Sequence, residues 1–498
     1  MKRTQKLKVN TVTSVINRIV RIISGLILPR LILQYFGSET NGLVASINQF
    51  LSIITFLDMG VGSVVQSALY KPLAKNDSLQ VSKVLKAANN YFRKIAYFLI
   101  IYVIALILFY PFLIDSTYDY IATGFLIFAL SVSLFGQYYF GIVNELLLNG
   151  DQKAYIQYGT EIVVIILNLI LGIILITQGA SIQIVQLGSG IIFLLRPFFL
   201  KKYVSKNYVI NKNVDISEDP LPQKWSGMAQ HVAYTIQSSI GTLVLTIFSS
   251  LESVSVYSVY LIVVNGISIL ASSMMSGISS FFGNLLATNE IDALNSYFNK
   301  IEWIIHNIVI YMYGMTAVLI TSFVLLYTSG IKDNVNYNVP LFALVLVLSK
   351  AVFSLRSPYQ TMVFSAGHFK ETEKSSIIEV LVNGVISVLL VNRMGIVGVV
   401  FGGLVSVVYR MIYLTYYLSR NIVHRPIKRF FKQFIVDIII FSLILVLGNI
   451  FNSIYTIETM GEWLFFAIVL GIVNIGLVII INVIFYREYT FSFLRRIF

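Results

Sequence analysis

The chain has 498 residues, of which 57% are hydrophobic and only 12% are charged. A water-soluble domain of this length could not tolerate so much apolar surface, so the composition indicates an integral membrane protein. The sequence has no cysteine and only four histidines, which excludes disulfides and a cysteine nucleophile and argues against a metal centre. The net charge of +13 could indicate nucleic acid binding, and its placement along the chain decides that question.

Hydrophobic segments of about 20 residues, long enough to span a bilayer as a helix, follow one another along nearly the whole chain. No segment is typical of a strand, and the first hydrophobic segment lacks the small-residue cleavage site of a signal peptide. The sequence therefore predicts an all-α, polytopic membrane protein of about fourteen transmembrane helices. They are expected near residues 11–36, 42–69, 92–114, 120–147, 155–177, 181–200, 227–250, 255–286, 303–329, 338–365, 375–392, 396–418, 432–452 and 462–486.

Lysine and arginine are distributed unevenly over the predicted loops. With the N-terminus in the cytoplasm, most of the 36 Lys and Arg residues fall on the cytoplasmic side, and only Lys332 and Arg393 fall outside. This asymmetry predicts an even number of spans in the cytoplasmic membrane, with both termini cytoplasmic. The surplus charge is then explained by topology and by contact with anionic membrane lipids, so we expect no nucleic acid partner.

Two pairs of similar segments indicate an internal repeat. VGSVVQSALYKPLAKND at residues 61–77 resembles SGISSFFGNLLATNE at residues 276–290, and both pass through small residues into an Ala-x-Asn-acid turn. Residues 146–176 resemble residues 362–391 in the same order. Chance similarity between apolar segments is the alternative explanation, but two ordered pairs favour a duplicated half.

A repeat of six spans predicts two bundles with the same membrane orientation, because six is even. A pseudo-two-fold axis along the membrane normal should relate them across a central cavity, an arrangement typical of alternating-access transport. The predicted parts are a six-helix bundle at 1–203, a cytoplasmic linker at 204–226, a second six-helix bundle at 227–419, and additional helices 13 and 14 at 420–498.

The first predicted span contains three arginines, each of which costs about 2.5 to 3.5 kcal/mol at a helix centre. Arg18 is interpreted as an interfacial anchor whose charge reaches the headgroups. Arg21 ends a polar stripe on the same helix face, so it either faces a wet, inward-opening cavity or also reaches the headgroups. Arg30 follows Pro29, which makes it either part of a kinked cavity wall or a second interfacial cation.

Two further cations fall within the tenth predicted span. Lys350 lies near its centre, where a lipid-facing ammonium would be most costly, so we expect it to face a cavity. Arg356 precedes a Ser-Pro kink and could face the same cavity. Arg196 and Arg410 occupy equivalent positions in the two halves, and we interpret both as interfacial cations that reach the headgroups.

Three acids are candidates for ion coupling. Asp58 in FLDMGVG is the most central, and it could bind a cation or pair with an arginine of the first span. Glu161 and Glu379 fall opposite each other in the repeat, within two turns of the ends of spans five and eleven. Interfacial acids are common, so a structural role is the alternative for both.

No phosphate loop, zinc-ligand spacing or nucleophile elbow is present in the sequence. The external loops are too short for the catalytic surface of a membrane-embedded polymerase or ligase. We therefore predict no enzyme activity, no cofactor and no metal, and expect an ion gradient or the substrate gradient to supply the energy.

The chain resembles a polysaccharide flippase of the multidrug/oligosaccharidyl-lipid/polysaccharide exporter superfamily. The resemblance covers essentially the whole length and is carried by LPRLILQYFGSETNGLVASINQFL at residues 28–51, by FLDMGVGSVVQSAL at residues 56–69, and by the two-times-six-plus-two span pattern. It implies translocation of undecaprenyl-pyrophosphate-linked oligosaccharide for O-antigen, capsule or a related surface polymer, with a polysaccharide polymerase and chain-length machinery as partners. In relatives that flip lipid-linked peptidoglycan precursor, spans 13 and 14 help form a groove for the lipid tail. Here these two spans contain a single clear charge, Asp437, which suits a similar role.

A lipid-linked pyrophosphate is an anion, so a pathway for it requires cations inside the protein. Three alternatives stay open: a multidrug and toxin extrusion type antiporter, a flippase for lipid-linked peptidoglycan precursor, and a noncatalytic membrane scaffold. An exporter of cations should carry more acids than bases in its cavity. The residues expected to bind the substrate are Arg18, Arg21, Arg30, Lys350 and Arg356.

Overall fold

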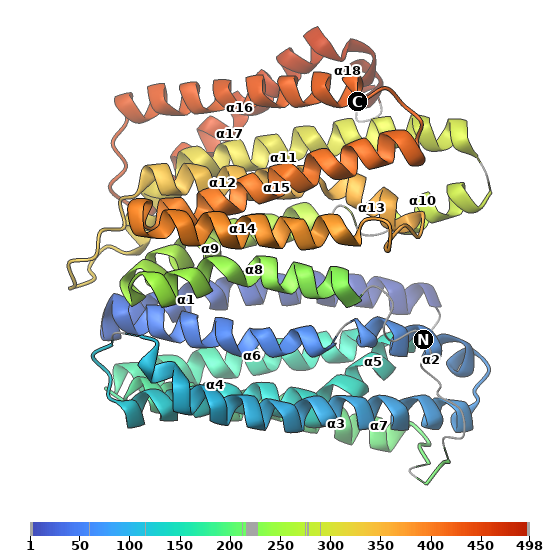
Figure 1. Ribbon diagram of the computed structural model, residues 1–498, viewed down its shortest axis with the longest axis vertical. Coiled ribbons are helices and arrows are strands. Elements are labelled where there is room, and N and C mark those ends of the chain that lie inside the picture. The colour runs from blue at the N-terminus through green and yellow to red at the C-terminus, as the bar shows by residue number, and fades with distance from the viewer. Residues whose placement is uncertain are drawn as a thin grey trace. The chain divides into compact units, whose positions relative to one another are not determined.

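The protein is described from a computed structural model, which covers residues 3–58, 60–114, 116–211, 213–215, 228–273, 275, 278–288 and 290–495. All regular structure in these ranges is helical (Figure 1). Residues 216–226 of the predicted linker and parts of the 276–290 repeat segment lie outside the described residues.

The chain begins with elements of the first half. They are α1 (Arg3–Ser52), η1 (Ile53–Asp58), α2 (Val61–Ala74), α3 (Ser78–Phe109), η2 (Tyr110–Phe112), α4 (Tyr120–Gly136), the π-helical η3 (Gln137–Gly141), α5 (Ile142–Gly150), α6 (Ala154–Thr177), α7 (Ile182–Asn207) and α8 (Met228–Phe248).

The remaining elements complete the chain. They are α9 (Leu251–Ser273), α10 (Ile278–Ala287), α11 (Ile291–Tyr327), α12 (Pro340–Leu355), α13 (Ser357–Ser365), α14 (Glu373–Met394), α15 (Ile396–Asn421), α16 (Lys428–Ile454), α17 (Met460–Phe485) and α18 (Arg487–Leu494).

Thirteen segments within the described residues are long and apolar enough to cross a membrane. The prediction of an all-α, multi-pass membrane protein is thereby confirmed. The difference from fourteen arises in α1, where residues 8–58 count as one segment. Gly37 interrupts this segment with φ 81° and ψ 175°, a conformation outside the helical region, so the two predicted spans 11–36 and 42–69 meet there.

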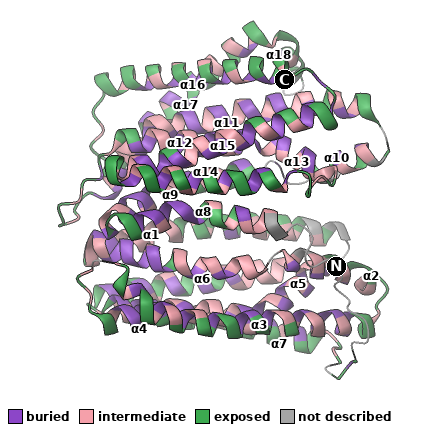
Figure 2. Cartoon of the chain, viewed as in Figure 1, coloured by how far each residue is buried: buried purple, intermediate pink, exposed green. Residues whose placement is uncertain are grey.

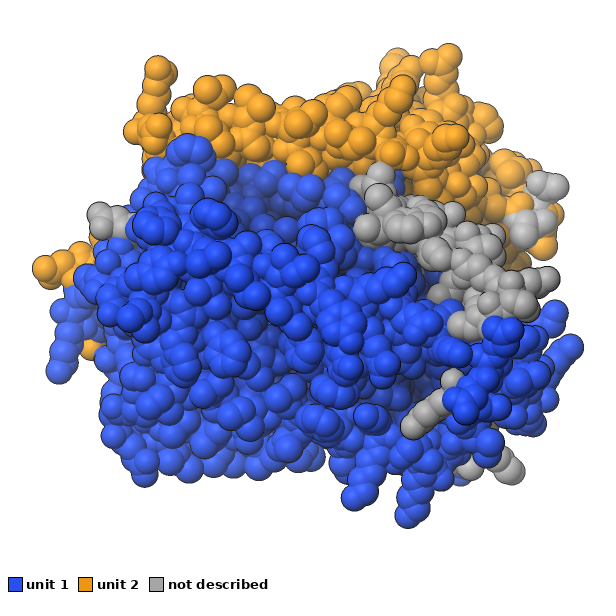
Figure 3. Space-filling view, turned by 60° about the horizontal axis from the view of Figure 1, so that its bottom comes forward, with its two compact units in different colours: residues 1–255, 331–333 blue, residues 256–330, 334–498 orange. Residues whose placement is uncertain are grey.

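Contacts divide the chain into two compact units (Figure 3). Unit 1 comprises residues 1–255 with 331–333, and unit 2 comprises residues 256–330 with 334–498. Helix α8, the seventh predicted span, packs on α1 and η1 within unit 1. The predicted bundle and linker boundaries stay a prediction.

The two units repeat the same set of helix contacts. In unit 1, α3 packs on α4, α6 on α7, α4 on α7, and α2 on α5. In unit 2, the corresponding contacts are α11 with α12, α14 with α15, α12 with α15, and α10 with α13. Chance similarity of apolar segments would not produce matched contact sets, so the units are two copies of one helical design.

The breaks inside spans also match. In unit 1 the second span is interrupted at Gly60, which has φ 72° before α2, and the fourth passes through η3. The counterparts in unit 2 divide into α9 and α10, and into α12 and α13. Pro358 at the start of α13 explains the second of these breaks, because proline removes a backbone donor and clashes with the preceding turn.

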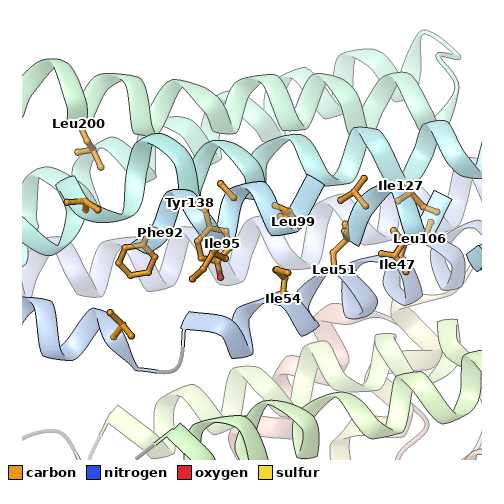
Figure 4. Close-up of a cluster of buried hydrophobic side chains, with 14 of the residues drawn as sticks. Ile47, Leu51, Ile54, Phe92, Ile95, Leu99, Leu106, Ile127, Tyr138 and Leu200 are labelled. Carbon is orange, nitrogen blue, oxygen red and sulfur yellow. The ribbon is translucent and has the colours of Figure 1, made fainter. Parts of the chain in front are cut away.

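The interior of unit 1 is an apolar cluster built around α3. Phe92, Ile95 and Leu99 of α3 lie against Ile54 and the Tyr138 ring (Figure 4). On the outer faces of α3, α6, α16 and α17, large apolar side chains are exposed instead (Figure 2). Exposed apolar faces on long helices fit contact with lipid tails rather than water.

Candidate functional site

Four charged side chains from four helices form a connected set of ion pairs in unit 1. Glu161 of α6 pairs with Arg21 of α1 and lies 3.6 Å from Arg196 of α7, and Arg196 lies 3.1 Å from Glu145 of α5. Two acids and two arginines balance in charge. Glu145 and Glu161 are buried, but 59% of the Arg21 side chain is exposed, so its other N–H groups can bind a ligand.

A cavity of about 350 Å³ lies beside this set in unit 1. The Nε atom of Arg196 is buried without a hydrogen-bond partner among the described residues. Gln137 of η3 donates a hydrogen bond of 3.1 Å to Glu145. The cavity therefore presents a cation among hydroxyl and amide groups, which suits a polar or anionic ligand. Its walls include Arg196, Gln137, Asn48, Ser52, Thr55 and Ser133.

Unit 2 contains an equivalent set around Glu379 of α14. Glu379 pairs with Arg356, at the junction of α12 and α13, and lies 3.8 Å from Arg410 of α15. Arg410 also donates to the Thr372 carbonyl at 2.8 Å and to the Ser375 hydroxyl. Only 4% of the Arg356 side chain and 2% of the Arg410 side chain are exposed. Each repeat glutamate is thus shared by two arginines.

Lys350 gives the set in unit 2 a surplus of positive charge. It is a half-buried residue of α12, it interacts electrostatically with Arg356, and it forms no hydrogen bond or ion pair with any described residue. The Nε atom of Arg356 is buried without a hydrogen-bond partner. Arg356 and Arg410 therefore share a single carboxylate here, and Lys350, which interacts with Arg356, adds a cation that an anion could neutralise.

The other predicted site residues lie apart from these sets. Arg18 is exposed on α1, and Arg30 is half-buried on the same helix after Pro29. Asp58 ends η1, and its Oδ1 atom is buried without a hydrogen-bond partner. The ion pair predicted between Asp58 and an arginine of the first span is absent from the described residues.

The interpretation of Arg196 and Arg410 as headgroup anchors is wrong. Arg410 is buried and Arg196 is half-buried, and they bind the carboxylates of Glu379 and of Glu145 and Glu161, respectively. A buried carboxylate stabilises a nearby arginine through a charge-assisted hydrogen bond, so the arginine does not need to reach the lipid headgroups. Glu145, a lone acid in the apolar run around α5, is the residue that the sequence reasoning missed in unit 1.

Sequence reasoning also missed a buried polar network in unit 2. It joins Glu302 and His306 of α11 to Tyr359 of α13, Asp437 of α16 and Arg425. Arg425 falls in a predicted cytoplasmic loop, where topology alone accounts for a basic residue, yet it is buried and forms a bidentate pair with Glu302. Asp437 is 1% exposed and contacts His306, so it does not face a lipid groove.

Outside the spans, a smaller set of charges joins the N-terminal part of α1 to the loop between α5 and α6. Asp151 accepts a hydrogen bond from Tyr208 at 2.6 Å and pairs with Lys153 at 2.7 Å and with Lys6 at 3.5 Å. Burial alone would raise the pKa of Asp151, but the hydrogen bonds from Lys153 and Tyr208 and the lysine charges hold it below its usual value.

Several solved structures have the same arrangement of helices. A lipid II flippase, MurJ in an inward closed conformation, has a TM-score of 0.72 over 96% of this chain and 99% of its own, at 17% identity. The chain shares the fold of this flippase. MATE transporters of the MOP superfamily match over a smaller share of the chain. DinF-BH has a TM-score of 0.62 at 13% identity over 84% of this chain and 96% of its own.

The MATE transporter VcmN of Vibrio cholerae has a TM-score of 0.59 at 13% identity, over 84% of this chain and 98% of its own. No protein-family model matches the sequence, and no curated protein matches it. At these identities the likeness establishes the fold alone.

Proposed function

We propose that the chain is a flippase that moves undecaprenyl-pyrophosphate-linked oligosaccharide from the inner to the outer leaflet of the cytoplasmic membrane. The observation that carries this proposal is the surplus of positive charge in unit 2, where two buried arginines share one glutamate and Lys350 interacts electrostatically with one of them, Arg356. A pyrophosphate crossing the bilayer would complete this set, because its oxygens accept hydrogen bonds from both guanidinium and ammonium groups.

In this proposal the cations act in sequence during alternating access. Unit 1 offers the exposed guanidinium of Arg21 to the pyrophosphate, and unit 2 offers Lys350 and Arg356. Arg18 attracts the substrate at the cytoplasmic interface, and Arg30 belongs to the outer part of the path. The hydroxyl and amide groups of the cavity beside Arg196 suit the sugars, which present hydroxyls of both donor and acceptor character.

The proposal includes a cytoplasmic location for both termini and a surface-polysaccharide polymerase with its chain-length machinery as partners. The uneven distribution of lysine and arginine supports the orientation. Because the substrate arrives from membrane-bound transferases and leaves for polymerisation, the protein itself needs no catalytic group or cofactor.

A flippase for lipid-linked peptidoglycan precursor is the second candidate, and the high coverage of MurJ favours it. Lipid II likewise carries a pyrophosphate, so the same cations would serve both substrates. A MATE-type exporter of organic cations is less consistent with the charges. Glu161 and Glu379 are already shared by two arginines each, and Lys350 would repel a cationic substrate.

The test is complementation of a cell that lacks the protein but retains its sugar transferases. Arg21→Ala combined with Lys350→Ala should abolish surface polysaccharide at normal protein abundance and cause lipid-linked oligosaccharide to accumulate in the inner leaflet. Lys350→Arg should retain much of the activity because the charge remains. Lys374→Ala, at an exposed lysine at the start of α14, is the matched control and should behave as wild type.

Intact polysaccharide in the double variant would contradict the flippase proposal and favour a scaffold. Efflux of cationic dyes from vesicles, unaffected by Lys350→Ala, would favour the MATE-type alternative. Complementation of a strain that lacks its lipid II flippase would assign the peptidoglycan precursor instead.

A further inference from the structure

A chain of buried hydrogen bonds crosses unit 2 between α11, α13 and α16, and it shares no residue with the cation sets described above. Nδ1 of His306 lies 2.6 Å from Oδ2 of Asp437, and Nε2 of His306 lies 3.0 Å from the Tyr359 hydroxyl. That hydroxyl lies 2.6 Å from Oε1 of Glu302. His306 and Tyr359 are 0% exposed and Asp437 is 1% exposed.

The number of hydrogen-bond donors determines where the protons lie between Asp437, His306, Tyr359 and Glu302. A hydroxyl has one proton, and the Glu302 carboxylate, which already binds the Arg425 guanidinium, accepts it from Tyr359. The Nε2 atom of His306 must then donate to the Tyr359 oxygen. One further proton lies between Nδ1 and Asp437, so the His306–Asp437 pair holds two protons, as an imidazolium with a carboxylate.

In this protonated state, the four charged groups of the network have no net charge. The charges of His306 and Arg425 balance those of Asp437 and Glu302, and Gln433 donates a hydrogen bond of 3.0 Å to the second oxygen of Asp437. Removing one proton would leave a net negative charge in an interior site, where an uncompensated charge is costly. Proton loss therefore favours a different packing of α16 against α11 and α13.

A cavity of about 370 Å³ in unit 2 reaches the Glu302 end of these hydrogen bonds, and Gln433, which donates to Asp437, also lines it. Glu302 and Gln433 contribute to its walls, together with Arg429 and Lys432 of α16 and Tyr486, which follows α17. The other charged and titratable groups at this cavity are Arg487, Glu488 and Tyr489 of α18, and Arg425 faces the network from the loop before α16. The cavity gives protons a route to Glu302.

We propose that His306 and Asp437 form a proton-binding site, reached from this cavity through Glu302 and Tyr359, and that its occupancy drives the conformational cycle of the transporter. The proton-binding part stands on the geometry of unit 2 alone. The coupling to transport rests on the function proposed above. Asp58, Glu161 and Glu379, the acids expected from the sequence to couple ions, are not part of this site.

A proton leaves His306 through Tyr359 and Glu302. Nε2 of His306 gives its proton to the Tyr359 oxygen while the Tyr359 hydroxyl proton passes to the Glu302 carboxylate. His306 is then neutral and still donates from Nδ1 to Asp437, and Glu302 is a neutral acid. Glu302 releases its proton to water in the cavity, so one proton leaves and the net charge of the set falls from zero to minus one.

The direct test is the protonation state of His306 in the full-length protein. The other three histidines can be replaced in one variant, His231→Gln with His368→Gln and His424→Gln, which leaves His306 as the single imidazole. Nitrogen NMR of this protein with labelled histidine, from pH 5 to pH 9, should show a change from imidazolium to neutral imidazole. Asp437→Asn in the same background should move this transition to lower pH, because the carboxylate that stabilises the cation is removed.

An imidazole that stays in one protonation state over the whole range would overturn the proposal, as would a transition that Asp437→Asn leaves unchanged. Tyr359→Phe provides a second variant that keeps the His306–Asp437 pair and removes the relay. It should slow proton exchange at Nε2 several-fold, and an unchanged exchange rate would contradict the route through Glu302.

Coupling is tested in proteoliposomes containing undecaprenyl-pyrophosphate linked to a short oligosaccharide. The ratio of flipping rates with and without a gradient of one pH unit should differ from one by several-fold in the wild type and in the exposed-site control His424→Gln. In His306→Gln this ratio should fall to about one, and a wild-type ratio would contradict the coupling. If the wild-type protein moves no lipid-linked sugar under either condition, the proposed function fails while the NMR titration still decides the proton site.

Discussion

Replacing the shared glutamate of unit 2 should destabilise the protein far more than replacing its repeat counterpart in unit 1. Glu379→Gln would leave Arg356 and Arg410, with side chains 4% and 2% exposed, without their only carboxylate among the described residues. Removing one partner of a buried ion pair costs about 3 to 5 kcal/mol. We expect the lower part of this range, because Arg410 keeps its hydrogen bond of 2.8 Å to the Thr372 carbonyl.

Glu161→Gln is the matched control because it makes the same chemical change at the equivalent position. Arg196 would keep Glu145 at 3.1 Å, and Arg21 is already 59% exposed. The expected cost is therefore about 1 kcal/mol or less. With an unfolding entropy of about 2.1 cal/mol/K per residue, a chain of this length loses about 1 °C in Tm for each kcal/mol.

The assay is thermal unfolding of the purified protein in one detergent, followed by retained monomer on size exclusion. Glu379→Gln should lower the midpoint by about 3 to 4 °C, and Glu161→Gln by about 1 °C or less. Adding Arg356→Gln to Glu379→Gln should recover part of the loss, since one uncompensated charge is removed. Equal shifts for the two glutamates, or no recovery in the double variant, would refute this account of the buried charges.

Two further predictions concern packing and pH. Gly42→Ala should lower the melting temperature, because the new Cβ would lie 1.8 Å from the Leu251 carbonyl oxygen. Gly25→Ala is the control: its Cβ would have nothing within 4 Å, so it should be neutral or stabilising by up to about 1 kcal/mol. Similar melting temperatures for both variants would contradict the close approach of Gly42 to Leu251. The folded pKa of Asp151 lies below its usual value of 3.8, so its contribution to stability is present above that value and is lost as the pH falls through the folded pKa. Asp151→Asn should therefore destabilise the protein at pH 7 and converge with wild type on strong acidification, and a difference that persists in acid would indicate that the contact with Lys153 is not the cause.

The sequence was sufficient to predict the helices, because each one needs about 20 consecutive apolar residues and no soluble fold allows so many. The break at Gly37 could also have been placed, since the first two predicted spans end and begin beside it. The repeat could be detected because the small residues before α2 and α10 are retained in both halves. The structure has two units with matching helix contacts, which confirms the predicted repeat.

The charge sets could be predicted only in part. Arg21, Lys350 and Arg356 stood out because each interrupts an apolar run. Their partners did not, since Arg196 and Glu145 are far apart in the sequence and have no periodic relation, and only the packing of α5 against α7 brings them together. Arg425 lies in a basic loop whose other members are explained by topology, so nothing in its surroundings distinguishes it as a buried residue.

The network around His306 carried one usable signal. Glu302 and His306 are four residues apart, so they share a helix face in an otherwise apolar segment. The remaining members come from α13, α16 and the loop before α16, at positions that depend on tertiary packing. A local pattern can indicate one half of such a network but not its partners.

The π turn at η3 fixes which way the acid of α5 points. An α-helix turns by about 100° and rises about 1.5 Å per residue, and a π turn accommodates one extra residue within such a helix. Deleting a single residue between Gln137 and Gly141 would restore the regular pattern and rotate Glu145 away from Arg196 by about a quarter turn. An alignment of relatives must therefore place any one-residue gap within this π turn. A gap placed elsewhere in the helix would align Glu145, the acid that neutralises Arg196, with a neighbouring residue instead of its true equivalent.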